Sequence, residues 1–266
     1  MITTTIETID PSKAKEYLLW NKHNRPVNKF TVKQYAQEMK DGRWTLSNDA
    51  ITFFENHLLG NGQHRLYAII ESDYTGQFLV MRGLPAETFS NIDQGKKRTP
   101  SDNFNIGEIP NAANVSSIVR SYHFLKNGIT SNSRMCSTTL ALEIYNQHPD
   151  MFQEAYRKTA ITYNACRVMR ISLFGGLYAH LVIDKHHDPE KVERFIQECA
   201  GIEPNTKSNS PQLLRSLFIT YATSKSKNMS MPYRIGLLIK AWNYWITGKE
   251  IARLNVAYNE KNLEFI

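Results

Sequence analysis

The chain has 266 residues, of which 41% are hydrophobic, and a formal net charge of +7 at pH 7. That hydrophobic content suffices for a sizeable core, so it excludes a largely disordered chain. Most of the positive excess lies beyond residue 105, and it fits either contact with nucleotides or nucleic acid or an ordinary solubility charge.

The cysteines and the N-terminus indicate the compartment. Cys136, Cys166 and Cys199 are odd in number and widely spaced, which argues against a disulfide framework and against a CxxC metal pair. Residues 1–5 lack the charged and apolar segments of a signal peptide, and no apolar run has membrane-spanning length. We therefore expect a soluble, cytoplasmic protein with no membrane partner.

Up to about residue 100, strand and helix patterns alternate. The predicted elements are, in chain order, a strand at 4–9, a helix opened by Asp10-Pro11, a loop at 22–27, a helix at 31–42 capped by Thr31, strands at 51–54 and 58–59, a helix from Gln63, a strand at 77–81 and a helix at 86–92. Thr99 and Pro100 then have the pattern of an N-cap and a first helical position. A small mixed sheet with helices is expected in this part of the chain.

Beyond residue 105, strand patterns almost vanish. Helices are predicted at 111–126, 138–148, 149–163, 170–187, 189–199, 211–222 and 232–247. The adjacent glycines Gly175 and Gly176 inside one of them indicate a close helix–helix contact and not a phosphate site. We expect an α+β protein with an N-terminal α/β domain at residues 1–105, followed by an all-α helical domain at residues 106–266.

The most informative stretch is the box Gly60-Asn61-Gly62-Gln63-His64-Arg65. A short apolar run precedes it and helical spacing begins at Gln63, so the box is predicted to be a strand-to-helix junction. The first N–H groups of a helix have no intrahelical partner and lie at the positive end of the helix dipole. Together with the five donors of Arg65, such a junction suits a phosphate. A tight structural turn is the alternative interpretation.

The residues around this box occur in a characteristic order. Asp41-Gly42-Arg43-Trp44 comes first, then Gly62-Gln63-His64-Arg65-Leu66, then Ile92-Asp93 followed by Gly95, Arg98 and Thr99. The box and this order resemble the ParB/sulfiredoxin superfamily over about residues 6–105. The Gly-Gln-His-Arg version of the box resembles that of phage-type ParB-like proteins.

The resemblance implies a ParB/sulfiredoxin-like domain that binds a nucleoside triphosphate, ATP or CTP, usually with Mg²⁺. Carried over by position, Asn61, Gly62, Gln63, His64 and Arg65 would hold the polyphosphate. Gln63 stands where sulfiredoxin has its reactive cysteine and where ParB has a glutamate. Sulfinic-acid reduction is therefore excluded, and the CTP chemistry of ParB is not assumed.

Asp49, Asp93 and His64 are the candidates for Mg²⁺ binding or acid–base chemistry, because phosphoryl transfer needs a metal that bridges phosphates and a positioned base. Asp49 directly precedes a predicted strand beside the box, and Asp93 belongs to the motif that ends in Arg98 and Thr99. Glu38 is interpreted as a solvent-facing charge. No dedicated cluster of metal ligands is predicted.

Three cations, Lys96, Lys97 and Arg98, stand together before Thr99. They predict a contact with nucleic acid or phosphate, with a solvated turn as the alternative.

Two further motifs have both a structural and a functional interpretation. The stretch His186-His187-Asp188 resembles a metal site, but adjacent histidines point to different helix faces, so a helix C-terminal cap is favoured. The aromatic run around Trp242 and Trp245 is flanked by basic residues. It predicts either stacking on bases or the core face of an amphipathic helix.

Three functions follow as hypotheses. The first is hydrolysis of a nucleoside triphosphate, or transfer of its phosphate, by a protein of phage or mobile-element origin in a DNA-related process. The second is a non-enzymatic DNA-binding partition or regulatory protein. The third is a metal-dependent nuclease, although no paired-carboxylate motif stands out. DNA and a second copy of the chain are the further partners considered.

Overall fold

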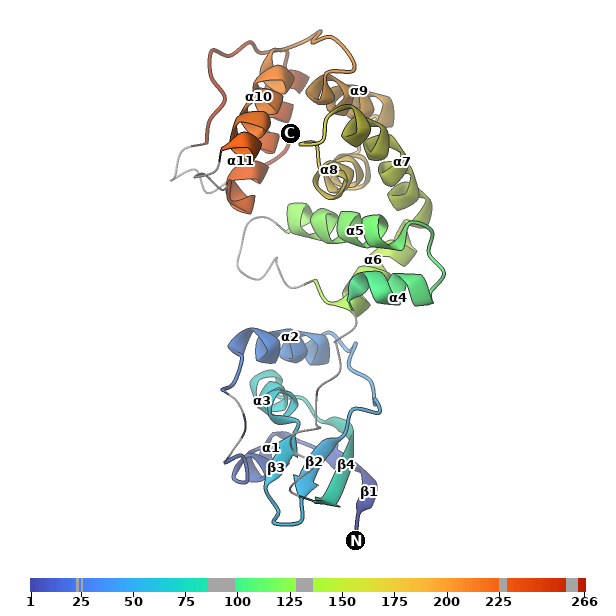
Figure 1. The fold of residues 1–266 in the computed structure, drawn as a ribbon, viewed down its shortest axis with the longest axis vertical. Coiled ribbons are helices and arrows are strands. Elements are labelled where there is room, and N and C mark those ends of the chain that lie inside the picture. The colour runs from blue at the N-terminus through green and yellow to red at the C-terminus, as the bar shows by residue number, and fades with distance from the viewer. Residues whose placement is uncertain (23, 25, 86–98, 128–135, 225–228, 257–262) are drawn as a thin grey trace. The chain divides into compact units, whose positions relative to one another are not determined.

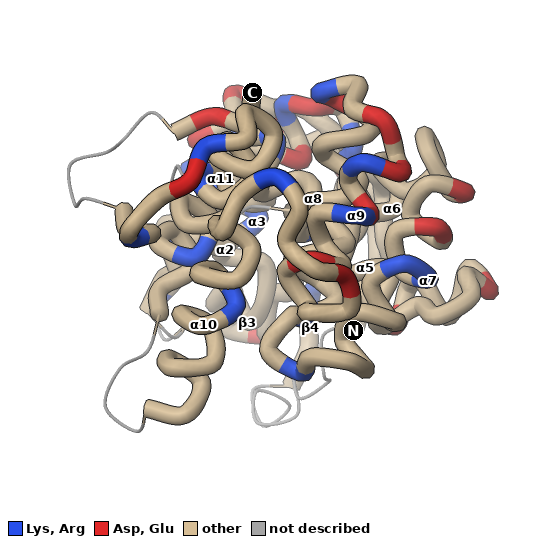
Figure 2. The backbone as a smooth tube through the Cα atoms, turned by 90° about the horizontal axis from the view of Figure 1, so that it is seen from above, with Lys and Arg blue, Asp and Glu red and all other residues tan. Residues whose placement is uncertain are grey.

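The computed structural model describes residues 1–22, 24, 26–85, 99–127, 136–224, 229–256 and 263–266. These residues form an α+β protein with a small mixed sheet, as predicted (Figure 1). The chain divides into two compact units, Met1–Lys97 and Arg98–Ile266. Along the helices, Lys and Arg positions are interspersed with Asp and Glu positions (Figure 2). None of the described helices is both long and apolar enough to cross a lipid bilayer.

The N-terminal unit is built around a four-stranded sheet in its described residues. Its elements are β1 (Thr3–Ile9), α1 (Pro11–Leu18), α2 (Lys29–Lys40), β2 (Ile51–Phe54), β3 (Leu59–Asn61), α3 (Gln63–Ser72) and β4 (Gly76–Leu84). The strand order is β1-β4-β2-β3; β2 and β4 run parallel, and the other neighbouring pairs are antiparallel. The two middle strands carry the buried residues Ile51, Phe78 and Val80, so they form the centre of the core.

Side chains in the preceding loops set the starts of α1 and α2. Asp10 caps α1 by accepting a hydrogen bond from the backbone N–H of Lys13. Asn28 caps α2 by accepting the N–H groups of Phe30 and Thr31. The prediction of Thr31 as the cap is therefore wrong, because Asn28 starts the helix earlier.

The second unit is helical throughout its described residues. Its elements are α4 (Pro100–Ile106), α5 (Ala112–Lys126), α6 (Thr138–Gln147), α7 (Pro149–Ala165), α8 (Ile171–Ile183), α9 (Pro189–Ala200), α10 (Ser210–Thr223) and α11 (Met231–Ile246). Every helix that the sequence predicts beyond residue 105 is present, with small shifts at the ends.

The division between the units lies before α4. Phe104 on α4 is fully buried in the helical core, and its ring lies 5.4 Å from that of Tyr145. Thr99 and Asp102 form a capping box at the start of α4, as the Thr99 pattern predicts. Because α4 packs with the helical unit, the division into compact units lies between Lys97 and Arg98, a few residues before the division expected at residue 105.

The two glycines of α8 lie against α5, as predicted. A Cβ atom on Gly175 would lie 2.6 Å from Cγ1 of Ile118. A Cβ atom on Gly176 would lie 2.6 Å from Cβ of Ser121 and 2.8 Å from the backbone N of Tyr122. Any larger side chain at Gly176 would therefore collide with the backbone of α5.

The aromatic run of α11 belongs to the core. Trp242 and Trp245 are fully buried, and both rings pack against Phe195 of α9. The indole Nε1–H of Trp245 donates a hydrogen bond of 2.8 Å to the carboxylate of Glu198, which is itself fully buried. Of the two interpretations of this run, the core face is correct, and stacking of these tryptophans on bases is excluded.

A charged network links β1, α1 and β4. The carboxylate of Glu7 accepts hydrogen bonds from the guanidinium of Arg82, from Tyr17 Oη at 2.5 Å and from Lys13 Nζ at 2.8 Å. Burial alone would raise the pKa of Glu7, but the hydrogen bonds from Arg82, Lys13 and Tyr17 outweigh burial and hold that pKa well below its usual range.

We expect Glu7→Gln to destabilise the N-terminal unit by about 2 kcal/mol at pH 7, because charge-assisted hydrogen bonds from two cations are lost. A carboxyl group whose pKa is depressed in the folded state contributes stability above its unfolded pKa and loses it as the pH falls. The difference between wild type and Glu7→Gln should therefore be constant above about pH 5 and shrink below about pH 4. Urea denaturation at several pH values checks this; a difference that grows on acidification would contradict it.

Candidate functional site

The predicted junction is present: β3 ends at Asn61, and α3 begins at Gln63. Gly62 between them has a φ of +108°, a backbone conformation that favours glycine. A Cβ atom there would lie 2.9 Å from Cγ1 of Ile51. The side-chain oxygen of Asn61 accepts the N–H of Gly62 at 2.7 Å and stabilises the turn. Both backbone conformation and space therefore require glycine where the strand turns into the helix.

Arg65 points into the protein. Only 5% of the residue is exposed. Its guanidinium donates hydrogen bonds to the backbone carbonyls of Asp49 and of Ala50, the latter at 3.0 Å. Arg65, which the sequence predicts to hold a phosphate, thus connects the residues just before β2 to the first turn of α3 through hydrogen bonds.

Gln63 and His64 bind the loop that follows α1. The amide of Asn21 donates a hydrogen bond of 3.1 Å to Oε1 of Gln63, which is buried. The backbone N–H of Asn28 donates a hydrogen bond of 3.0 Å to Nε2 of His64. Because Nε2 accepts a hydrogen bond here, Nδ1 is the ring nitrogen that carries a proton in this arrangement. The box side chains thus hold the loop from which α2 starts.

The helices α2 and α3 run side by side in the same direction. Asn28 and His64 are in contact at their N-terminal ends, and Ser72 Oγ lies 3.5 Å from Met39 Sδ at their C-terminal ends. Neither helix has an acidic residue in its first turn. Two positive helix ends therefore lie next to each other with no acidic side chain in either first turn, which favours an anion at this place.

Asp49 lies beside the box, as its position before β2 predicts. Its side chain is 66% exposed. One carboxylate oxygen lies 3.4 Å from Nδ2 of Asn61 and 3.4 Å from Nη2 of Arg65. Exposed carboxylate oxygens are the ligands that Mg²⁺ prefers, usually together with phosphate oxygens. Asp49 thus presents a largely exposed carboxylate beside the start of α3.

Glu38 is not the solvent-facing charge that the sequence predicts. It is only 8% exposed, and both of its carboxylate oxygens accept hydrogen bonds from Arg43, the shortest at 3.1 Å. The Glu38 carboxylate is buried because Arg43, which lies beyond the end of α2, folds back onto it. The ion pair gives Glu38 a structural role.

The remaining predicted site residues have different outcomes. Asp93, Lys96, Lys97 and Arg98 lie outside the described residues. The stretch His186-His187-Asp188 follows the end of α8 at Ile183 and contributes to its C-terminal cap, as predicted: the backbone N–H of His187 donates a hydrogen bond of 3.0 Å to the carbonyl of Leu181 in the last turn. His187 Nε2 lies 2.8 Å from the carbonyl of Ile266, and Asp188 caps α9. Within the described ranges, no group of three or more His, Cys, Asp and Glu side chains is placed to hold a metal ion.

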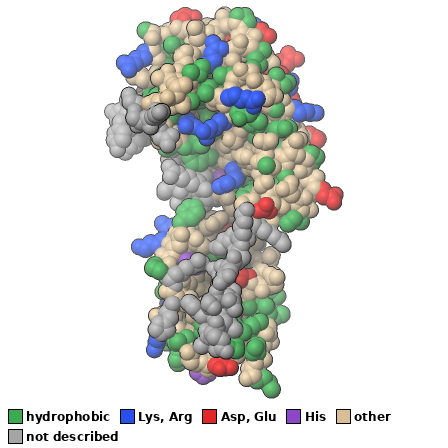
Figure 3. Space-filling view, viewed as in Figure 1, with side chains coloured by type: hydrophobic (Ala, Val, Ile, Leu, Met, Phe, Trp, Pro, Cys, Tyr) green, Lys and Arg blue, Asp and Glu red, His purple; other side chains and the backbone are tan. Residues whose placement is uncertain are grey.

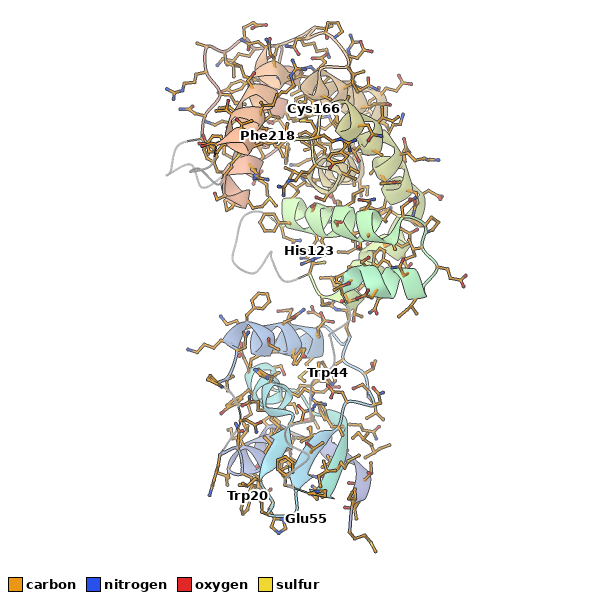
Figure 4. All side chains as sticks on the ribbon, in the orientation of Figure 1. Trp20, Trp44, Glu55, His123, Cys166 and Phe218 are labelled. Carbon is orange, nitrogen blue, oxygen red and sulfur yellow. The ribbon has the colours of Figure 1, made fainter. Side chains whose placement is uncertain are left out.

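A pocket of about 800 Å³ lies at the other end of β2, away from the box. Trp20 and Glu55, which line it, lie near each other at this end of the unit, and Trp44 lies elsewhere in it (Figure 4). The carboxylates of Glu16 and Glu55 line it together with the cations of Lys13 and Arg82. Because these charges balance, the pocket has no clear preference for an anion, and its cations already bind Glu7.

Comparison of the chain with protein-family models, with curated proteins and with solved structures finds no match. The functional assignment therefore starts from the geometry of the junction. Sequence reasoning missed Asn28 and Lys29 as members of this site, because they belong to the loop and the first turn of a different helix. An asparagine followed by a helical pattern was the signal that could have located that helix start.

Proposed function

We propose that the chain is a ParB/sulfiredoxin-like protein that binds a nucleoside triphosphate, with Mg²⁺, at the adjacent N-terminal ends of α2 and α3. The observation that carries this proposal is the side-by-side position of two helix starts with no acidic residue in either first turn. A polyphosphate would neutralise both helix ends. The order of the sequence motifs and the small mixed sheet support the same assignment.

Gly62, Arg65 and Asp49 then have separate parts in this site. The glycine turn at Gly62 sets the start of α3, and the exposed Lys29 adds a cation at the start of α2. Asp49 would hold Mg²⁺, which supplies charge neutralisation between phosphate groups. Arg65 contributes indirectly, by fixing Asp49 and Ala50 against α3.

An exposed aromatic side chain beside the site is available for the base. Phe30 follows Lys29 on the first turn of α2 and is 52% exposed. Stacking of an aromatic ring on a nucleobase tolerates different bases, so this contact fits ATP and CTP alike. Hydrolysis or transfer of the terminal phosphate in a DNA-related process, by a protein of phage or mobile-element origin, is the activity that we assign to this site.

The test is a thermal-shift and calorimetric titration with ATP, CTP and inorganic tripolyphosphate, each with and without Mg²⁺. We expect Asp49→Asn to weaken binding about tenfold in Mg²⁺ and to change it little without the metal. The matched control is Asp73→Asn, which changes an exposed aspartate at the opposite end of α3. Equal Mg²⁺-dependent affinities of the two variants would overturn the role of Asp49.

Two further pairs of measurements separate the parts of the ligand. Lys29→Gln should weaken binding of all three compounds, whereas Lys40→Gln at the other end of α2 should leave it unchanged. Phe30→Ala should weaken ATP and CTP binding but leave tripolyphosphate binding unaltered. If none of the three compounds stabilises the wild-type protein at millimolar concentration, the proposed function is wrong.

A further inference from the structure

The sheet of the N-terminal unit has two edges, and one of them is covered. The strand at that edge, β3, is only three residues long, and the loop that follows α1 lies against it. The backbone N–H of Leu59 donates a hydrogen bond of 3.0 Å to the carbonyl of Trp20, and the amide of Asn24 donates one of 2.7 Å to the carbonyl of Leu59. These bonds occupy backbone groups of β3, so another strand cannot pair there.

The other edge of the sheet is formed by β1. This strand runs antiparallel to β4 over all seven of its residues, from Thr3 opposite Arg82 to Ile9 opposite Gly76 (Figure 1). Every second residue of an edge strand directs its backbone N–H and C=O groups away from the neighbouring strand. Within the described ranges, no backbone hydrogen bond outside the β1–β4 ladder reaches residues 3–8.

The side chains of β1 leave this edge accessible. Ile6 is 58% exposed. In Figure 3, hydrophobic side chains reach the surface on the side of the N-terminal unit where Figure 1 draws β1. The exposed residues of the strand are Thr3, Thr4, Thr5, Ile6 and Thr8. A further strand therefore has access to the backbone of β1.

Features that usually protect an edge strand are absent from β1. Such features are short length, bulges, proline and outward-pointing charges. The register of β1 against β4 has no bulge, and the strand contains neither proline nor lysine. Its one charged residue, Glu7, is held within the unit by Arg82 and Lys13. All its other residues are threonine or isoleucine, whose branched side chains favour strands.

The sequence of β1 is complementary to itself. When two copies of the strand are aligned antiparallel about Ile6, Ile6 lies opposite Ile6 of the second copy, and Thr5 lies opposite Glu7. No like charges face each other, and pairs of branched side chains on adjacent strands stabilise a sheet. Ile6 also lies opposite Leu79 of β4. The two copies would thus align four apolar side chains in a row across the joined sheets.

We propose that β1 is a homodimerisation surface, at which the β1 strands of two copies pair antiparallel with Ile6 on the two-fold axis. The two four-stranded sheets then form one continuous sheet. Such an interface uses the same edge of both copies and therefore closes on itself. The covered edge at β3 prevents further strand addition, so the expected assembly is a dimer and not a fibre.

The test is sedimentation velocity of the full chain between about 1 μM and about 1 mM, where we expect a concentration-dependent dimer. Ile6→Lys places two ammonium groups opposite each other and should weaken the dimer at least about tenfold. The matched control is Ile161→Lys on α7, which introduces the same charge at an isoleucine of similar exposure, 59%, and should leave the dimer unchanged. Asp49→Asn should also leave it unchanged, because dimerisation is independent of the nucleotide site.

Two further experiments test the register. A mixture of the Ile6→Lys and Ile6→Glu chains should recover the dimer, because opposite charges then meet at the two-fold axis. Ile6→Cys should form a disulfide between copies on mild oxidation, since directly opposite residues lie within disulfide range. Thr3→Cys should not, because the two copies of residue 3 would lie about 20 Å apart along the strands.

Three results would each overturn the proposal. The first is a wild-type chain that stays monomeric up to about 1 mM, which would leave the edge of β1 to a different partner. The second is equal dimerisation of the Ile6→Lys and Ile161→Lys chains, which would place the interface elsewhere. The third is cross-linking of Thr3→Cys as readily as of Ile6→Cys, which would exclude pairing about Ile6.

Discussion

Arg65→Met is expected to destabilise the N-terminal unit by about 3 kcal/mol, because a buried guanidinium that satisfies two backbone carbonyls is replaced by a side chain without donors. The carbonyls of Asp49 and Ala50 accept those hydrogen bonds at the start of β2. Methionine fills a similar length and is apolar, so the loss reflects the missing hydrogen bonds more than a cavity. Because β2 lies next to both β3 and β4, the effect should spread through the sheet.

Urea denaturation of the full chain, with hydrogen exchange of the amides in β2 and α3, measures this loss and assigns it to the N-terminal unit. Arg65→Lys should recover only part of the stability, because an ammonium group lacks the planar fork that reaches two carbonyls at once. An Arg65→Met protein as stable as wild type, with unchanged exchange in β2, would show that these hydrogen bonds contribute nothing net.

The structural role of Arg65 makes its variants ambiguous in binding experiments on the box. A nucleotide-binding defect in an Arg65 variant has two explanations, loss of a phosphate contact and loss of the fold around it. Asp49 and Lys29 are exposed, so their substitution changes the charge near the helix starts without removing a buried hydrogen bond. They are therefore the sharper positions at which to test ligand binding.

Gly176→Ala is expected to destabilise the helical unit by about 2 kcal/mol. Helix propensity alone predicts the opposite sign, a gain of about 1 kcal/mol. The propensity gain is outweighed because the new methyl group would lie 2.6 Å from Cβ of Ser121 and 2.8 Å from the backbone of Tyr122. A backbone cannot move aside as the end of a flexible side chain can, so α5 and α8 would have to separate.

Gly107→Ala is the matched control in the same unit. A Cβ atom at Gly107 would lie no closer than 3.5 Å to its neighbours, and its φ of −79° is open to any residue. We expect this change to be neutral or slightly stabilising. Thermal unfolding of the two variants checks the pair, and a stabilising effect of Gly176→Ala would show that α5 and α8 tolerate a wider spacing.

Hydrophobic periods and turn residues, which can be recognised within a short segment of the sequence, predicted much of the fold. Apolar residues at helical spacing located the helices of the second unit, since that period is a property of each segment alone. The strand-to-helix turn at Gly62 followed from a strand pattern, two glycines and a helical pattern in succession. Asp49 was expected beside the box because it directly precedes the strand that pairs with β3.

Side-chain direction and partners could not be predicted in the same way. Arg65 was expected to face a phosphate, and it binds backbone carbonyls because β2 passes close to the first turn of α3. Glu38 is buried because Arg43 folds back onto it. Trp242 and Trp245 lie in a basic stretch, yet both face the core against α9. In each case the deciding neighbour comes from packing, which local sequence does not specify.

The sequence by itself determined which segments are helices and strands, the α+β class and the place of the glycine turn. These features follow from hydrophobic period, capping residues and the backbone freedom of glycine, which act over a few residues. Only the tertiary structure decided that the starts of α2 and α3 lie side by side. Electrostatic sites of this kind depend on distances between residues far apart in the chain, and those distances are set by how the helices pack.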